Sequence, residues 1–325
     1  MIGARRLVGW VDPFLAALLL ALAAGLLVPV GDGVRAGLGV ASDVAVTLLF
    51  LLYGMRLPTS EVLAGLRNVR LQGSVLAATY LLFPAVGLLL ALVTRPLLGD
   101  TLATGFLYVS LLPSTVQSSV VFTATGRGNV AGAVCAATVS NTLGVVLTPL
   151  LVLALLRSDG VAPDATAVGD IALRLVLPFV VGQLLERRLG ARVRAHPRVT
   201  TITDRGTVVL VLFTAVVGAT ADGSWDALTP WRFAGILAVS AVLLVVMLVL
   251  TWTGGRLVGL DRPDRVALLM CGSKKSLATG LPMATVIFGA TTAATLVLPL
   301  IVFHQLQLMV GAVLARRLGR APLGQ

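Results

Sequence analysis

Long apolar runs separated by short polar connections fill most of the sequence. A helix needs about 20 predominantly apolar residues to cross the hydrocarbon core of a bilayer. The first run follows Arg5 and Arg6 and is similar to a signal peptide, but it continues beyond Ala23 and many further runs follow, so it is taken as a span. The pattern predicts ten spans, over residues 13–30, 40–57, 71–94, 102–124, 129–156, 168–187, 202–220, 232–256, 266–289 and 291–314.

The composition agrees with a membrane protein. Of the 325 residues, 57% are hydrophobic and 12% are charged, whereas soluble domains carry roughly 25% charged residues. The net charge of +11 is compatible with nucleic-acid binding, but the basic residues form short clusters between the apolar runs rather than one patch. This distribution indicates a lipid bilayer as the partner and no nucleic acid.

The positions of the basic residues predict a topology. Of the 25 Lys and Arg residues, 18 fall in connections on one side of the ten spans and four in connections on the other side. Because cytoplasmic loops are enriched in Lys and Arg, both termini are expected in the cytoplasm of a multi-pass protein of the plasma (inner) membrane. The chain reads as one membrane domain, residues 1–325, with inverted five-span halves at about 1–160 and 161–325.

The fourth span of each half is interrupted by residues that weaken a helix. Pro113 precedes a polar cluster over residues 114–119, and Gly272 precedes another over 273–276, with Pro282 further on. Proline removes a helical hydrogen bond and glycine loosens the backbone, so both spans are predicted to break and to cross. Unpaired backbone at membrane depth must line a cavity or be buried, which predicts a transport site there; simple kinks in packed helices are the alternative.

Lys274 and Lys275, the only two lysines, lie within the ninth span. A charged side chain at the bilayer centre costs about 3 kcal/mol or more, so a functional role is expected. Adjacent helical residues point about 100° apart, and the pattern leaves open which lysine faces the cavity.

The acidic residues all fall in loops or near predicted span ends, so a coupling carboxylate is missing from the span centres. Na+, H+ and no coupling ion remain alternatives, and no other cofactor or metal is expected. Arg174 is predicted to pair locally with Asp170, and both cysteines to pack as small residues. Candidate binding residues are Ser114, Gln117, Ser118, Ser119, Thr138, Ser140, Asn141, Ser273, Lys274, Lys275, Ser276, His304, Gln305 and Gln307. A buried, hydrogen-bonded role for His304 is as plausible as proton coupling.

The sequence resembles the sodium/bile acid cotransporter superfamily, and most closely its bile-acid-symporter-like branch. The residues that carry this resemblance are LPSTVQSSV at 112–120, GRGNVA at 126–131, TVSN at 138–141, LTP at 147–149 and CGSKKSLA at 271–278. It covers nearly the whole chain. The resemblance implies a core and a panel subdomain, unwound spans four and nine, and sodium-driven uptake of organic anions.

In that family pattern, Ser118 and Ser119 match a polar pair that helps to coordinate sodium, and Thr138 lies near a hydroxyl ligand of span five. Two positions depart from it: Met270 stands where the sodium cotransporters carry glutamate, and Lys274 where they carry glutamine. We hypothesise that the Lys274 ammonium takes the place of a bound sodium ion and makes the site receptive to a carboxylate or sulfate.

The sequence therefore predicts an all-α polytopic membrane protein that acts as a secondary active transporter of a small organic anion by alternating access. A non-transporting regulator with the same fold is an alternative. A membrane enzyme is disfavoured, because no acid pair, HExxH or GxSxG motif is present. The substrate, the direction of transport and the oligomeric state do not follow from the residues.

Overall fold

The computed structural model describes residues 13–56, 68–156, 169, 171–223, 225 and 229–320, so Arg5 and Arg6 lie outside it. All regular elements in these ranges are helical. They are α2 (Pro13–Leu27), α3 (Asp32–Arg56), α5 (Val69–Ala77), η1 (Ala78–Leu82), α6 (Phe83–Leu98), α7 (Asp100–Leu111), α8 (Gln117–Thr125), α9 (Val130–Leu155), η3 (Ala172–Val176), α11 (Leu177–Leu185), η4 (Glu186–Gly190), α12 (Ala191–Ala195), α13 (Pro197–Ala221), α14 (Pro230–Leu257), α15 (Arg262–Gly272), α16 (Leu277–Phe288), α17 (Ala290–Leu296) and α18 (Leu298–Arg320). The η segments are π-helical.

Within the described ranges, six helices are long and apolar enough to cross a membrane. They are α3, the continuous stretch Val69–Leu98, α9, α13, α14 and α18. The other predicted spans contain shorter pieces: α2 has 15 residues, spans four and nine are divided into α7 with α8 and α15 with α16, and the described part of span six contains η3 and the nine-residue α11. An all-helical polytopic membrane protein is thus confirmed, while the count of ten spans stays a prediction.

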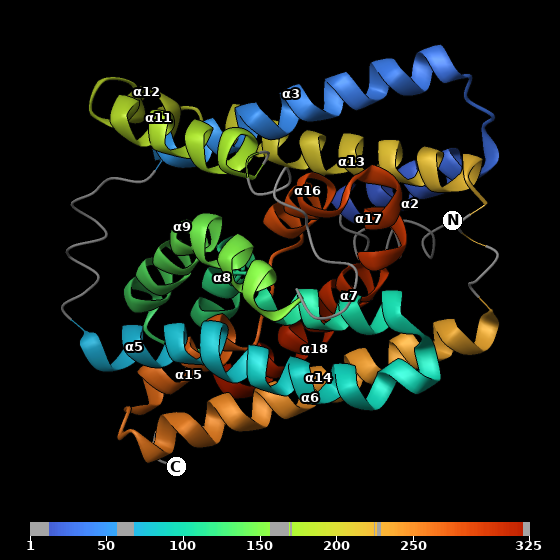
Figure 1. Cartoon of the computed structure of the whole chain (residues 1–325). Helices are drawn as coiled ribbons and strands as arrows, with labels where there is room; N and C mark the ends of the chain where they lie inside the picture. Colours follow the sequence, from blue (N-terminus) through green and yellow to red (C-terminus); the bar gives the residue numbers. More distant parts are fainter. Residues whose placement is uncertain are drawn as a thin grey trace, which may run out of the picture.

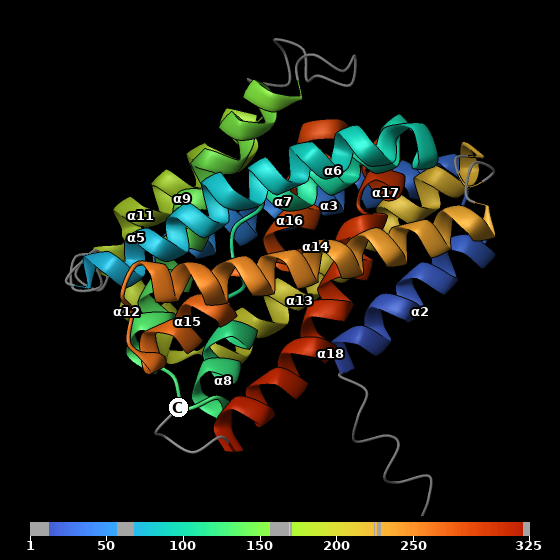
Figure 2. The same ribbon diagram turned by 90° about the horizontal axis from the view of Figure 1, so that it is seen from below.

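The helices form two layers (Figure 1). One layer contains α2, α3, α11 and α13, and the other, thicker layer contains α5 to α9 and α14 to α18. In the view from below, α14 crosses the second layer and packs against α18 (Figure 2). The layers meet where α13 packs on α16 and α17. Ala215, Ala219 and Ala294 form a small buried cluster at that boundary.

Two glycines bring α3 and α11 into backbone contact. A Cβ atom on Gly54 would lie 2.1 Å from the Phe179 carbonyl oxygen, and one on Gly182 would lie 2.1 Å from the Leu51 carbonyl oxygen. Neither position accepts a larger residue unless the backbones separate. Glycine at these positions therefore sets the close approach of the two helices.

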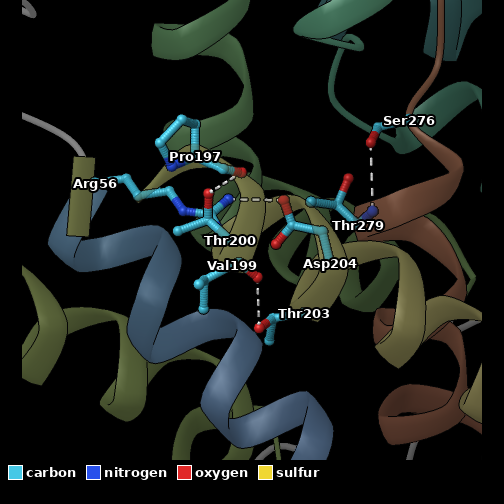
Figure 3. Close-up of polar contacts among 8 residues, drawn as sticks. All are labelled: Arg56, Pro197, Val199, Thr200, Thr203, Asp204, Ser276 and Thr279. Atoms are coloured by element: carbon cyan, nitrogen blue, oxygen red, sulfur yellow. Dashed lines mark hydrogen bonds and ion pairs between the residues drawn. The ribbon is translucent and has the colours of Figure 1, made fainter. Parts of the chain in front are cut away.

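An ion pair fixes α3 against α13 at one end of the first layer (Figure 3). Arg56, the last residue of α3, places its Nη1 atom 2.7 Å from Oδ2 of Asp204, and each side chain is 23% exposed. The same end of α13 carries Thr200 and Thr203, whose hydroxyls donate to carbonyls of the preceding helical turn.

The π-helical turn η1 frees a carbonyl group because of the proline that follows it. The Phe83 N–H donates to the Ala78 carbonyl, five residues earlier. In this pairing the next bond would join residue 84 to Thr79, but Pro84 has no N–H to donate. The Thr79 carbonyl is therefore available to another donor.

The prediction that no carboxylate lies near a span centre is wrong for Asp43. The helix α3 begins at Asp32, eight residues before the predicted span, because the glycine-containing segment 33–39 is also helical. Asp43 consequently lies near the middle of α3 and pairs with Arg174 at 2.7 Å, with both side chains about half exposed. Asp170, the predicted partner of Arg174, lies outside the described residues.

The prediction that Pro282 breaks a helix is also wrong. The helix α16 runs from Leu277 to Phe288 with Pro282 inside it. Because Pro282 lies in the second turn, the helix loses only the bond to the Ala278 carbonyl and continues. The predicted span 291–314, in contrast, is divided at Val297. The helix α17 ends at Leu296, and α18 begins at Leu298, with Pro299 in its first turn.

Candidate substrate and ion site at the helix crossing

The helix α7 ends where Pro113 interrupts it. Leu112 adopts an extended conformation (φ −74°, ψ 156°), as expected for a residue that precedes proline. The chain becomes helical again at Gln117. Because the last carbonyl groups of a helix have no partner within it, the end of α7 needs donors from elsewhere.

All four carbonyl groups over residues 110–113 accept hydrogen bonds from donors in other parts of the chain. Those of Ser110 and Leu112 accept from Nζ of Lys275 (2.8 and 2.6 Å), that of Leu111 from the Thr148 hydroxyl (2.9 Å), and that of Pro113 from the Ser276 N–H (2.9 Å). Three of these four hydrogen bonds come from side chains, two of them from Lys275. The carbonyl groups exposed by the interruption are therefore paired through tertiary contacts.

The carbonyl groups at the end of α15 are also paired by hydrogen bonds from side chains. Its helix ends at Gly272, and Ser276 caps the start of α16 by accepting from the Thr279 N–H at 3.3 Å (Figure 3). The carbonyl of Leu269 accepts from Ser273 (2.5 Å), that of Met270 from Ser119 (2.9 Å) and that of Cys271 from Ser114 (2.5 Å). Residues 110–119 and 269–276 thus bind each other directly, and we call these two segments the crossing.

Lys275 is enclosed by oxygen atoms within the crossing. Its side chain is fully buried, and Nζ donates to the carbonyl groups of Thr79 (2.9 Å), Ser110 (2.8 Å) and Leu112 (2.6 Å). Nζ also lies 4.1 Å from the centroid of the Phe83 ring, within range of a cation–π interaction. The three hydrogen bonds use every N–H donor of an ammonium group.

Lys274 has a different environment. It is 2% exposed, yet Nζ has no hydrogen-bond partner among the described residues. The ammonium lies 3.8 Å from the centroid of the Phe122 ring. A Cβ atom added to Gly311 would come within 3.3 Å of Nζ. A buried donor without a partner is costly and calls for a functional explanation.

The helix α18 supports the lysine pair through Gln307. Its Oε1 accepts from the Lys275 N–H at 2.8 Å, and its Nε2 donates to the Lys275 carbonyl at 2.8 Å. His304 Nδ1 lies 2.8 Å from the same Nε2 atom and 3.5 Å from the Lys275 carbonyl oxygen. His304 is buried, so these contacts favour the hydrogen-bonded interpretation of this histidine.

The remaining candidate residues differ in burial and in hydrogen bonding. Ser118 contacts the Thr115 hydroxyl at 2.7 Å and is half-buried. The side-chain oxygen of Asn141 is buried and has no hydrogen-bond partner in the described part of the chain. Gln117 is exposed, and Thr138 and Gln305 are half-buried; no hydrogen bond from these three side chains is found in the described ranges.

Several contributors to the site were not predicted. Thr79 supplies its carbonyl from the π-helical turn, while Phe83 and Phe122 supply aromatic faces. Tyr80 donates to the Ser140 carbonyl at 2.5 Å and joins η1 to α9. Pro84 was the only sequence signal for this region, because a proline within an apolar span frees a carbonyl in the turn before it.

An all-helical fold with two interrupted, mutually satisfied helices and buried lysines defines a polytopic membrane protein of the transporter class. The model of the SBF-like CPA transporter family matches residues 12–320. The chain belongs to this family and is a transporter rather than an enzyme.

Curated relatives agree with this membership. The chain is 43% identical over 281 residues to "Uncharacterized protein PA2026" of Pseudomonas aeruginosa, covering 86% of this chain and 84% of that protein. It is 40% identical to "Putative symporter YfeH" of Escherichia coli, covering 85% and 83%. Mouse "Sodium/bile acid cotransporter 7" is 27% identical, covering 84% and 81%.

Proposed function

We propose that this transporter is a secondary active carrier of a small organic anion and that the anion binds at the crossing. The observation that carries the proposal is the Lys274 ammonium, which is buried and has no hydrogen-bond partner in the described ranges. A carboxylate or sulfate would supply the missing acceptor and a compensating charge. The hydroxyls of Ser114, Ser118 and Ser119 lie in the other segment of the crossing, residues 110–119.

The proposal includes the hypothesis that Lys274 takes the place of a bound sodium ion. Its fixed positive charge would attract the anion without an ion from solution. Because Lys274 is only 2% exposed, the substrate would need a rearrangement to reach it, as alternating access requires. Flux under a sodium gradient, under a proton gradient and without either distinguishes Na+ coupling, H+ coupling and uncoupled transport.

The proposed arrangement has ten spans in two inverted halves, with both termini in the cytoplasm of the plasma membrane. The polar connections between helix ends support a common basic face. Arg56 binds Asp204, and Arg262 donates to the Leu318 carbonyl at 2.6 Å. These contacts bring the basic ends of α3, α13, α15 and α18 into pairs, as expected if they share one side of the membrane.

Binding of anions to purified protein tests the proposal. A panel of carboxylates and sulfates would be screened by thermal shift for the parent, Lys274→Gln and the charge-conserving Lys274→Arg. Anion stabilisation is expected in the parent, a loss of about tenfold or more in affinity in Lys274→Gln, and partial recovery in Lys274→Arg. Equal anion affinity in the parent and in Lys274→Gln would refute the role of Lys274.

Flux through liposomes separates a carrier from a regulator. An anion found in the screen would be followed into proteoliposomes under a sodium gradient, under a proton gradient and without either. Saturable uptake that Lys274→Gln abolishes is the expected result. Binding without uptake under all three conditions would favour the non-transporting regulator.

A further inference from the structure

The π-helical turn η1 and the end of α7 together create a cation site at the crossing. The Thr79 carbonyl is free because Pro84 cannot donate to it, and the Ser110 and Leu112 carbonyls are free because α7 ends there. The negative end of the α7 dipole adds to their potential. Such a group of buried carbonyls is unfavourable unless a cation or several N–H donors occupy its centre.

We propose that this is a site for a small monovalent cation and that the chain fills it permanently with the Lys275 ammonium. The distances of 2.6–2.9 Å from Nζ to the three oxygens are those of charge-assisted hydrogen bonds. The Phe83 ring, 4.1 Å from Nζ, closes another side. Because the ammonium is covalently attached, no ion can enter or leave this site during a transport cycle.

The two lysines therefore have separate roles. Lys275 has three oxygen partners in its site, whereas Lys274 has none in the described part of the chain. This inference concerns the occupant of the carbonyl site and does not depend on what the protein carries. The anion-attracting role proposed for Lys274 is unaffected, because the carbonyl site is filled by its neighbour.

Removal of the side chain should convert the filled site into an empty one. Lys275→Ala leaves the three carbonyls and a volume that methylammonium, the charged end of the missing side chain, can occupy. The thermal midpoint of the purified variant would be measured in methylammonium chloride, with tetramethylammonium chloride at equal ionic strength as the control, since that cation has no N–H donors. A saturable rise of at least about 2 °C specific to methylammonium is expected in Lys275→Ala.

The parent and Lys274→Ala serve as matched controls, and neither should respond specifically to methylammonium. A folded Lys275→Ala protein that responds equally to both salts would overturn the proposal. If this variant cannot be recovered folded, Lys275→Gln tests the same site, because its shorter amide leaves room for one ion and adds an oxygen ligand. A saturable Na+-specific rise is then expected in Lys275→Gln and not in Lys274→Gln, and its absence would equally refute the inference.

Discussion

Replacement of Gln307 by leucine should destabilise the crossing from a position outside it. Gln307 is 1% exposed, and leucine is close to it in volume, so the change removes hydrogen bonds with little change in packing. Two bonds to the Lys275 backbone are lost, one to its N–H and one to its carbonyl, both 2.8 Å long, together with the contact to His304 Nδ1.

The magnitude follows from the two unpaired backbone groups. A buried group without a partner costs about 1–3 kcal/mol, but hydrogen bonds between membrane helices average only about 0.6 kcal/mol with a maximum near 1.7. Two such bonds give about 1–3 kcal/mol. At roughly 2 °C per kcal/mol, the lower end of the range for chains of 150–250 residues because this chain is longer, the thermal midpoint should fall by about 2–6 °C.

The assay is intrinsic tryptophan fluorescence of the detergent-purified protein during heating, with Gln305→Leu as the matched control. Gln305 lies on the same helix and is half-buried, and no hydrogen bond from its side chain is found in the described ranges. Its replacement should change the midpoint by less than about 1 °C, as for substitutions that disturb no buried contact. Equal midpoints for the two variants would show that Gln307 does not support the lysine pair.

Two further changes probe the packing on either side of the crossing. Gly182→Ala should abolish recovery of folded protein, because the new Cβ would lie 2.1 Å from the Leu51 carbonyl oxygen. The control is Gly206→Ala on α13, whose Cβ would meet nothing within 4 Å and which should be neutral or stabilising by about 0.5–1 kcal/mol. The chromatographic yield of folded protein compares the two variants. Asp264→Ala should lower the thermal midpoint by several degrees, because this carboxylate accepts hydrogen bonds at 2.7 Å from the side-chain amides of Asn68 and Asn129, which precede α5 and α9. Each of these bonds is worth about 1.5–3 kcal/mol. An unchanged midpoint would contradict this prediction.

The positions of the two interruptions could be predicted from local chemistry. Pro113 cannot continue a helix, and the hydroxyls of Ser273 and Ser276, on either side of the lysines, offer alternative partners to the backbone. The environment of each lysine could not be predicted, because it depends on residues far away in sequence. The oxygen ligands of Lys275 come from a turn near residue 79 and from the end of α7, and only the folded chain brings them together.

The errors have equally specific causes. Asp43 was assigned to a span end because hydropathy locates apolar stretches, not helix ends, and α3 begins eight residues earlier than its apolar part. Pro282 was taken as a break because proline weakens helices in general, although in an early turn it removes only one bond. Both cases show that the local cost of a residue depends on its distance from the helix end.

The mutual satisfaction of the two broken helices has a mechanical consequence. Since the ends of α7 and α15 hold each other through side chains and backbone, pulling them apart would expose several buried polar groups at once. We therefore expect the two segments of the crossing to move together as one rigid unit during the transport cycle. The alanine-lined boundary where α13 meets α17 offers a smoother surface, so sliding between the layers is the less costly way to let water reach the buried lysines.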